Sequence, residues 1–359
     1  MNTLNHNYKR VWLLSDIHFG VHASSMMWLD RIDDYFTNFF IPLLQKNKQD
    51  NDVLFVLGDT FDNRININSI ILNKTIEVFK KISEILPIEI LIGNHDTAYK
   101  NTNDVNSLSY LDYYPNINVN SQPKKITTEY SNLLLLPWQK SNADFDENVK
   151  MAGKIDYIFC HHDFNGLTYN NSSVKIENGI NPTDISDIKH IFSGHIHKKQ
   201  STEKLTMVGN PLHTTRNDMN NIKGIFLLCL ENDNVEFFEN KYSSRFIELE
   251  LLNELNTPLD EFKEKINNNI VDLIIRKDIQ AQYNWDTFSD ILKTSAETKI
   301  ILSENEVTNN YTLDVDVNEF KIDNVLNSYI VKLEQPPAIK QMMKDKIKEL
   351  YDVVNTKDK

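Results

Sequence analysis

The sequence predicts an α/β protein whose reactive groups lie at the C-terminal ends of buried strands. Apolar runs at 11–14, 53–57 and 88–92 have the length and composition of buried strands. The segments between them, 26–44 and 68–86, carry apolar residues at helical spacing. Strands and helices in alternation indicate a layered α/β core, in which active groups collect where the strands end.

The bulk composition is that of a globular protein. The chain has 359 residues, of which 40% are hydrophobic and 25% charged, which suits one large or two to three smaller domains. A net charge of −13 argues against a protein that coats nucleic acid. It does not exclude a nucleic-acid enzyme, because bound divalent ions would add positive charge where a phosphate must lie.

The cysteines and the N-terminus predict a cytoplasmic location, in the host cytoplasm if the protein is viral. Cys160 and Cys229 each close an apolar run and are expected to be buried free thiols, as in a reducing compartment. The N-terminal residues lack the apolar core of a signal peptide. No apolar stretch approaches the ~20 residues of a membrane span, so no membrane association is expected.

The first two strands each deliver a carboxylate. Asp16 and His18 follow the run 11–14, and in an extended segment a spacing of two places them on the same side, where both can reach one ion. An ordinary Asp turn with a chance His nearby is the alternative. Asp59 follows the run 53–57 directly after a glycine.

The third strand ends in Gly93–Asp96, with Asn94 and His95 side by side. At a strand tip, adjacent side chains point in different directions, so only one of the two is expected to reach a metal directly.

Later strands add imidazoles. The run 157–160 is followed by His161 and His162; His161 follows the strand directly and is the expected ligand, with His162 as the alternative. The run 191–193 leads to His195 and His197, which a spacing of two would direct the same way.

The strand-tip groups together predict a metal centre. Carboxylates, one carboxamide and several imidazoles, without a thiolate, suit Mn²⁺, Fe²⁺, Zn²⁺ or Mg²⁺. There are more candidate ligands than one ion takes, which favours two ions bridged by a shared carboxylate and hydrolysis of a phosphoester. The groups are Asp16, His18, Asp59, Asn94, His95, His161, His195 and His197.

The C-terminal third differs from the rest. Residues 252–325 mix a helical pattern at 259–266 with an alternating strand pattern at 311–317, which predicts a small α+β domain. Beyond 336 the chain has six lysines against four acidic residues, and a helical apolar stripe that either docks on a partner or folds back. The stripe consists of Ile339, Met342, Met343, Ile347, Leu350 and Val354.

Five segments, in order, resemble the motifs of calcineurin-like metallophosphoesterases. Within that superfamily the chain is most similar to the nuclease subunit of double-strand-break repair complexes, of the bacterial SbcD type and its counterpart in large phages. The resemblance implies a layered αββα sandwich at 1–245, a small capping and DNA-contact domain at 246–330 and a helical tail at 331–359. The segments are Asp16-x-His18, Gly58-Asp59-x-x-Asp62, Gly93–Asp96, His161 and Gly194-His195-x-His197.

The resemblance also implies roles for these residues. Asp16, His18, Asp59 and His197 would hold one ion, and Asp59, Asn94, His161 and His195 the other. His95 would protonate the leaving oxygen, oriented by Asp96. Mn²⁺ is the first choice of metal, with Mg²⁺, Fe²⁺ and Zn²⁺ as alternatives. Asp62 stands where archaeal and eukaryotic members carry His.

The resemblance further implies a DNA exonuclease and endonuclease of repair and recombination. Its partners would be DNA ends and single-strand/duplex junctions, a coiled-coil SMC-like ATPase bound by the tail, and a second copy of the chain. A free-standing phosphodiesterase or phosphatase with a small substrate is the alternative, and a non-catalytic scaffold is a third. The extra domain and the tail favour the nuclease, and the complete set of candidate ligands disfavours the scaffold.

Overall fold

The computed structural model describes residues 2–99, 102–169, 174–254, 257–276, 291–303 and residue 341. The strand predicted at 311–317 and nearly all of the tail beyond 336 lie outside the described residues. None of the helices in the described ranges has the length and apolar character needed to cross a membrane.

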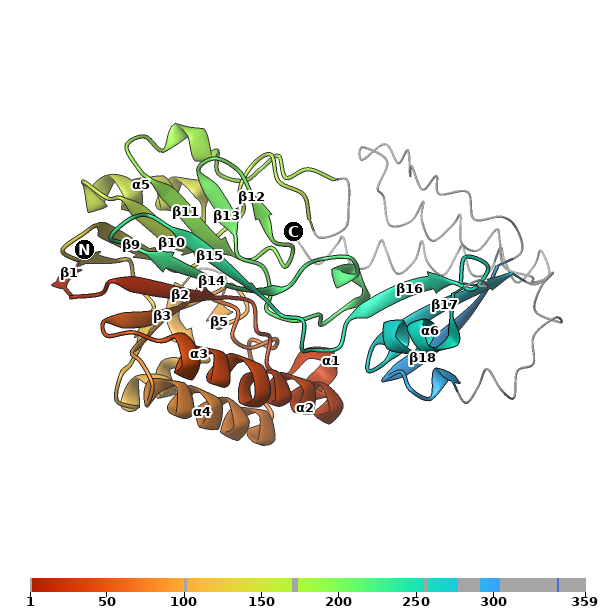
Figure 1. Cartoon of the computed structure of the whole chain (residues 1–359). Coiled ribbons are helices and arrows are strands. Elements are labelled where there is room, and N and C mark those ends of the chain that lie inside the picture. Colours follow the sequence, from red (N-terminus) through yellow and green to blue (C-terminus); the bar gives the residue numbers. More distant parts are fainter. Residues whose placement is uncertain are drawn as a thin grey trace. The chain divides into compact units, whose positions relative to one another are not determined.

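Two sheets form the body of the fold (Figure 1). The first has six strands, in the spatial order β15 (Val235–Glu239), β14 (Gly224–Cys229), β2 (Arg10–Leu14), β3 (Asp52–Val56), β4 (Ile88–Leu91) and β7 (Ile117–Asn120). The second has seven strands, in the order β1 (Asn2–Asn5), β8 (Lys124–Thr127), β9 (Asn132–Leu136), β10 (Tyr157–His161), β11 (His190–Gly194), β13 (Leu205–Met207) and β12 (Gln200–Ser201). The strands that carry the predicted motifs run parallel to their motif-bearing neighbours: β2, β3 and β4 in one sheet, and β10 and β11 in the other.

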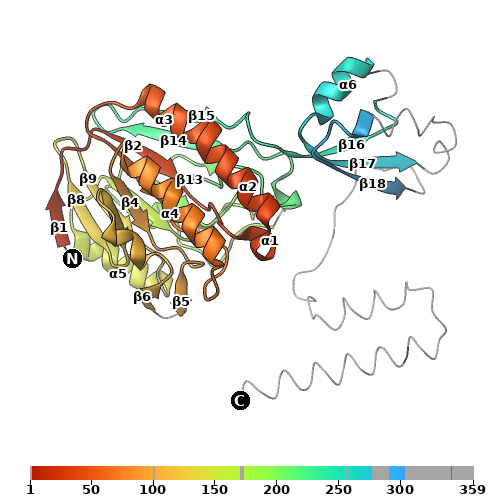
Figure 2. The same cartoon turned by 90° about the horizontal axis from the view of Figure 1, so that it is seen from below.

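Alternate side chains of each strand enter different layers of the core. On β2, Val11 and Leu13 pack between the two sheets, whereas Trp12 and Leu14 pack under helices. The helices on that outer face are α2 (Met26–Tyr35), α3 (Ile41–Asn47) and α4 (Ser69–Ser83), while α5 (Asn142–Ala152) covers the other sheet (Figure 2). The αββα sandwich is therefore confirmed.

The sequence predicted two of these helical segments, at 26–44 and 68–86, but not α5. The helix predicted at 26–44 is present as α2 and α3, joined by a π-helical stretch, Phe36–Phe40. The helix predicted at 68–86 is present as α4, and the Asn68 side chain caps it by accepting a hydrogen bond from the Ile70 amide. Helix α5 was not predicted; its polar sequence leaves only Phe145 and Ala152 buried.

A third sheet follows the sandwich. Its strands β16 (Phe246–Glu250), β17 (Ile270–Arg276) and β18 (Glu297–Ser303) are all parallel. Helix α6 (Leu259–Ile266) has the predicted range and packs Phe262 and Ile266 into a separate core with Val271 and Leu273. The domain boundaries at 245 and 330 stay predictions.

Short elements complete the described chain. They are a left-handed turn α1 (Val21–Ser24), the hairpin β5 (Thr97–Tyr99) and β6 (Thr102–Asn106), and the 3-10 turns Ser109–Tyr113, Pro182–Asp184 and Arg216–Asp218.

Candidate metal centre

Asp16, His18 and His197 form the first group of candidate ligands. Their ligand atoms lie within 4.8 Å of one another, and Nε2 of His18 is 3.0 Å from Nε2 of His197. Burial, and then the neighbouring His18, lower the pKa of His197 to about 4, so its ring is neutral near pH 7. Burial acts to lower the pKa of the facing His18, but the carboxylates of Asp62, Asp59 and Asp16 outweigh it and raise this pKa. The surroundings thus favour a positive charge between the two ring nitrogens, so this donor set fits a metal ion.

Asp59, His161 and His195 form the second group, and Asn94 joins it. The Asn94 Oδ1 lies 2.9 Å from Nε2 of His161 and 2.8 Å from Nδ1 of His195. Burial acts to lower the pKa of His161, but the carboxylates of Asp59 and Asp16 outweigh it and raise this pKa to about 9. The buried carboxylates thus favour a positive charge at this point, which a divalent ion would also supply.

Asp59 connects the two groups. Its Oδ2 is 3.3 Å from Nε2 of His161 in the second group and 3.8 Å from Nε2 of His18 in the first. Its Oδ1 accepts a hydrogen bond from the His95 amide at 2.8 Å. The carboxylate is nearly fully buried and can therefore face both groups at once.

The backbone around these ligands is not extended. Asp16 (φ 53°), His18 (φ 54°), Asp59 (φ 51°) and His195 (φ 84°) all lie in the left-handed region. The spacing-of-two argument was therefore wrong. Asp16 and His18 do share a group, but His195 and His197 belong to different ones. Strained residues of this kind concentrate at functional sites.

Two glycines, Gly93 and Gly194, allow the loops that carry the candidate ligands to pack closely against one another. A Cβ at Gly93 would collide with the backbone and carboxylate of Asp59. A Cβ at Gly194 would collide with the Ser15 hydroxyl and the His161 ring. Only glycine therefore permits the close approach that places the ligands of neighbouring strands together.

His95 lies beside the first group, and its supporting residue differs from the prediction. Its ring centroid is 5.0 Å from that of His18, and its Nδ1 is 2.7 Å from the backbone carbonyl oxygen of Asp62. Asp62 also places Oδ1 3.5 Å from Nδ1 of His18. Asp62 thus holds the outer sides of two histidines, which is the usual task of residues behind metal ligands.

Asp96 does not orient His95. Its buried carboxylate accepts hydrogen bonds from the amides of Gly93, Thr60 and Phe61. Burial, and then Asp59, raise its pKa to about 7, which weakens the negative charge expected beside His95. The predicted orienting contact is wrong, because the carboxylate instead joins two loops.

The structure distinguishes His161, the last residue of β10, from His162, which follows it. His161 faces the second group, whereas His162 stacks on Trp138 at 5.3 Å and contacts Phe145, where burial lowers its pKa to about 4. Asp163, which sequence reasoning missed, places Oδ2 3.4 Å from Nε2 of His195. No local signal marks this pairing, since 31 positions separate the partners.

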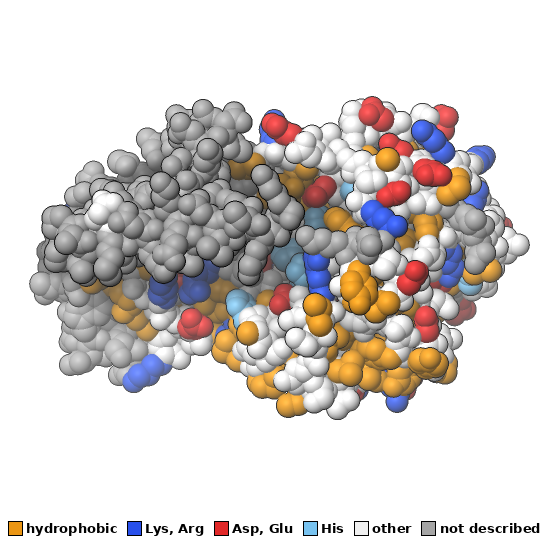
Figure 3. Space-filling model, turned by 180° about the vertical axis from the view of Figure 1, so that it is seen from behind, with side chains coloured by type: hydrophobic (Ala, Val, Ile, Leu, Met, Phe, Trp, Pro, Cys, Tyr) orange, Lys and Arg blue, Asp and Glu red, His pale blue; other side chains and the backbone are white. Residues whose placement is uncertain are grey.

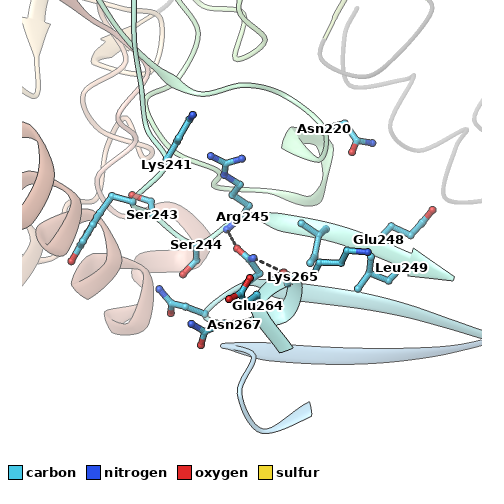
Figure 4. Close-up of a pocket in the computed structure, with 14 residues that line it drawn as sticks. Asn220, Lys241, Ser243, Ser244, Arg245, Glu248, Leu249, Glu264, Lys265 and Asn267 are labelled. Carbon is cyan, nitrogen blue, oxygen red and sulfur yellow. Dashed lines mark hydrogen bonds between the residues drawn. The ribbon is translucent and has the colours of Figure 1, made fainter. Parts of the chain in front are cut away.

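Histidine side chains gather in the middle of one face of the molecule (Figure 3). All seven residues that the resemblance implies as ligands are brought together, although their binding of ions stays a prediction. A cavity of about 680 Å³ lies elsewhere, beside the chain segment 241–249 and α6 (Figure 4). Its lining includes Lys241, Arg245 and Glu264 but none of the candidate ligands.

A family model for calcineurin-like phosphoesterases matches residues 9–199, which contain every candidate ligand. The chain therefore belongs to the calcineurin-like phosphoesterase family, whose members are metal-dependent hydrolases.

One curated relative is Exonuclease subunit 1 of Enterobacteria phage T4, which is 27% identical over 237 residues. The match covers 63% of this chain and 66% of the relative, so the chain spans just under two thirds of the relative's length. Among solved structures, a protein of unknown function from Aquifex aeolicus matches 46% of this chain and 81% of its own, with 18% identity and a TM-score of 0.27.

Proposed function

We propose that this protein is a nuclease of DNA repair and recombination that hydrolyses phosphodiesters with two divalent ions, Mn²⁺ first among them. The observation that carries the proposal is the position of the Asp59 carboxylate between two groups of ligands. Ions bound there would activate water and stabilise the charge of an in-line displacement at phosphorus.

Individual residues of the chain would bind the ions, protonate the leaving oxygen and orient the ligand rings. Asp16, His18, Asp59 and His197 would hold one ion, and Asp59, Asn94, His161 and His195 the other. The Asp62 carbonyl holds Nδ1 of His95, which leaves Nε2 as the nitrogen that carries a proton to the departing oxygen. Asp163 and Asp62 keep the rings of His195 and His18 in place.

A comparison of substrates tests the proposal. Purified protein loaded with Mn²⁺ should release nucleotides from linear duplex DNA, measured by gel electrophoresis, and chelation should stop the reaction. Cleavage of bis-(p-nitrophenyl) phosphate without cleavage of DNA would instead support the free-standing phosphodiesterase. Inactivity toward both substrates would support the scaffold.

The DNA substrate and the partner rest on two observations. The phage relative is named as an exonuclease subunit, which implies an assembly in that protein. In this chain, the stripe that begins at Ile339 and the basic tail suit a helix that docks in the groove of another protein. We propose a homodimer whose tails bind a coiled-coil ATPase.

Deletion of residues 336–359 should abolish co-purification with that ATPase and leave Mn²⁺-dependent nuclease activity intact. Activity should remain because the predicted ligands all lie far upstream of the deleted segment. Association should be lost because the deletion removes the apolar stripe. Pull-down with the co-expressed ATPase measures association, and the DNA assay measures activity. Unchanged association would reject the role of the tail.

A further inference from the structure

A buried ion pair, Lys223 and Asp218, contacts the backbone of His197 through the lysine. Nζ of Lys223 is 2.6 Å from Oδ1 of Asp218, and their side chains are only 2% and 0% exposed. Lys223 immediately precedes β14, and Asp218 ends the 3-10 turn Arg216–Asp218. Within the described part of the chain, neither residue belongs to the groups of candidate ligands.

Lys223 has all three of its N–H donors in use. One donates to Asp218, one to the side-chain oxygen of Asn210, and the third to the backbone carbonyl of His197 at 2.8 Å. The Asn210 amide donates to the same carbonyl at 3.2 Å. The main chain of His197 is thus held from behind by two donors.

The Asp218 carboxylate also accepts hydrogen bonds from the backbone. Its Oδ2 accepts hydrogen bonds from the amides of Thr214 and Thr215, each at 2.9 Å. Its neighbour Arg216 donates to Asp272 on β17 at 2.9 Å, so the same turn is also fastened to the third sheet. Hydrogen bonds therefore connect the loop 210–218 both to the backbone of His197 and to the third sheet.

A contribution to the stability of the fold does not by itself explain why an ion pair is buried here. A buried ion pair loses so much hydration that an apolar pair of similar size often stabilises a fold equally well or better. What an apolar pair does not supply is a donor aimed at the His197 carbonyl. His195, two residues before His197, has a left-handed φ of 84°, a sparsely populated conformation that persists only where surrounding contacts hold the chain.

We propose that Lys223 and Asp218 are positioning residues that fix His197 for binding of the ion in the first group. The inference rests on the metal centre of the proposed function. Neither residue is a candidate ligand; the pair sets where the His197 ring lies opposite His18.

The test compares Lys223→Met with Lys124→Met. Lys124 forms another ion pair, 2.8 Å from the fully buried Glu89, with side chains 13% and 0% exposed. The hydrogen-bond partners of Glu89 include Asn118 and Asn120, and neither residue of the pair is a candidate ligand. Both variants should lower the melting temperature. Only Lys223→Met should weaken one of the two Mn²⁺ sites, by about 10–100-fold, the usual cost of removing an outer partner.

Calorimetric titration with Mn²⁺ measures each affinity, and the exchange-coupled Mn²⁺ signal in electron paramagnetic resonance reports whether both sites fill. Equal Mn²⁺ affinities in Lys223→Met and wild type, or equal losses in the two variants, would overturn the inference. A wild-type protein that binds no Mn²⁺ would instead overturn the metal centre itself, so the two failures are distinguishable.

The double variant Lys223→Met/Asp218→Asn covers the case in which the single variant does not fold. It removes both buried charges while Asn still accepts from the amides of Thr214 and Thr215. It should recover stability relative to Lys223→Met, yet keep the weakened Mn²⁺ site because the His197 carbonyl still lacks its donor. Full recovery of Mn²⁺ affinity would show that the pair acts on stability only.

Discussion

Asp59→Asn should lower the occupancy of both metal sites and abolish hydrolysis. The Asp59 carboxylate lies within 4 Å of a ring nitrogen in both groups, so losing its charge should weaken both ions together. The loss of Mn²⁺ affinity should exceed the roughly 10–100-fold typical of an outer partner, because Asp59 would be a direct ligand. Metal analysis after Mn²⁺ loading and dialysis measures the effect.

Asp52→Asn is the matched control for this variant. Asp52 is another buried carboxylate at the opposite end of β3, where it accepts hydrogen bonds from Arg10 and Trp12. Its loss should lower stability and leave both ions bound. A single tightly bound zinc ion that survives Asp59→Asn would contradict the two-metal centre.

His95→Gln should keep both metals and DNA binding but lose about 10²–10⁴-fold in DNA cleavage, the usual contribution of a positioned acid. The bond from residue 95 to Asp59 comes from the backbone amide and survives the change. A nitrophenolate leaving group needs no proton, so bis-(p-nitrophenyl) phosphate should lose much less. Parallel rate measurements on the two substrates provide the check.

His190→Gln is the control, since His190 lies at the start of β11 and pairs with the Thr206 hydroxyl. It should leave both rates near the wild-type values. Equal losses on the two substrates in His95→Gln, or loss of a metal, would show that His95 does not act as a general acid.

Helices and strands with a strong local period were predictable from the sequence. The patterns at 26–44, 68–86 and 259–266 all became helices, because apolar spacing selects the face that a helix buries. The weakly apolar α5 escaped prediction, since its capping residue Ser141 is a common residue of loops.

The mutual arrangement of the site residues was less predictable. A spacing of two implies one side only in an extended chain, and the left-handed φ values of His18 and His195 break that rule. Asp96 contacts the amide of Phe61, Asp163 contacts His195, and Lys223 contacts the carbonyl of His197. Each of these partners lies in another loop, so nothing local marks the contact.

The sequence by itself determined which side chains stand at the strand ends, and hence the chemistry of the donors, because a buried strand must end in a polar loop. Only the tertiary structure decided which donors share a group and which residues support them. Parallel strands bring distant loops to one edge, and there close packing at Gly93 and Gly194 selects a single arrangement.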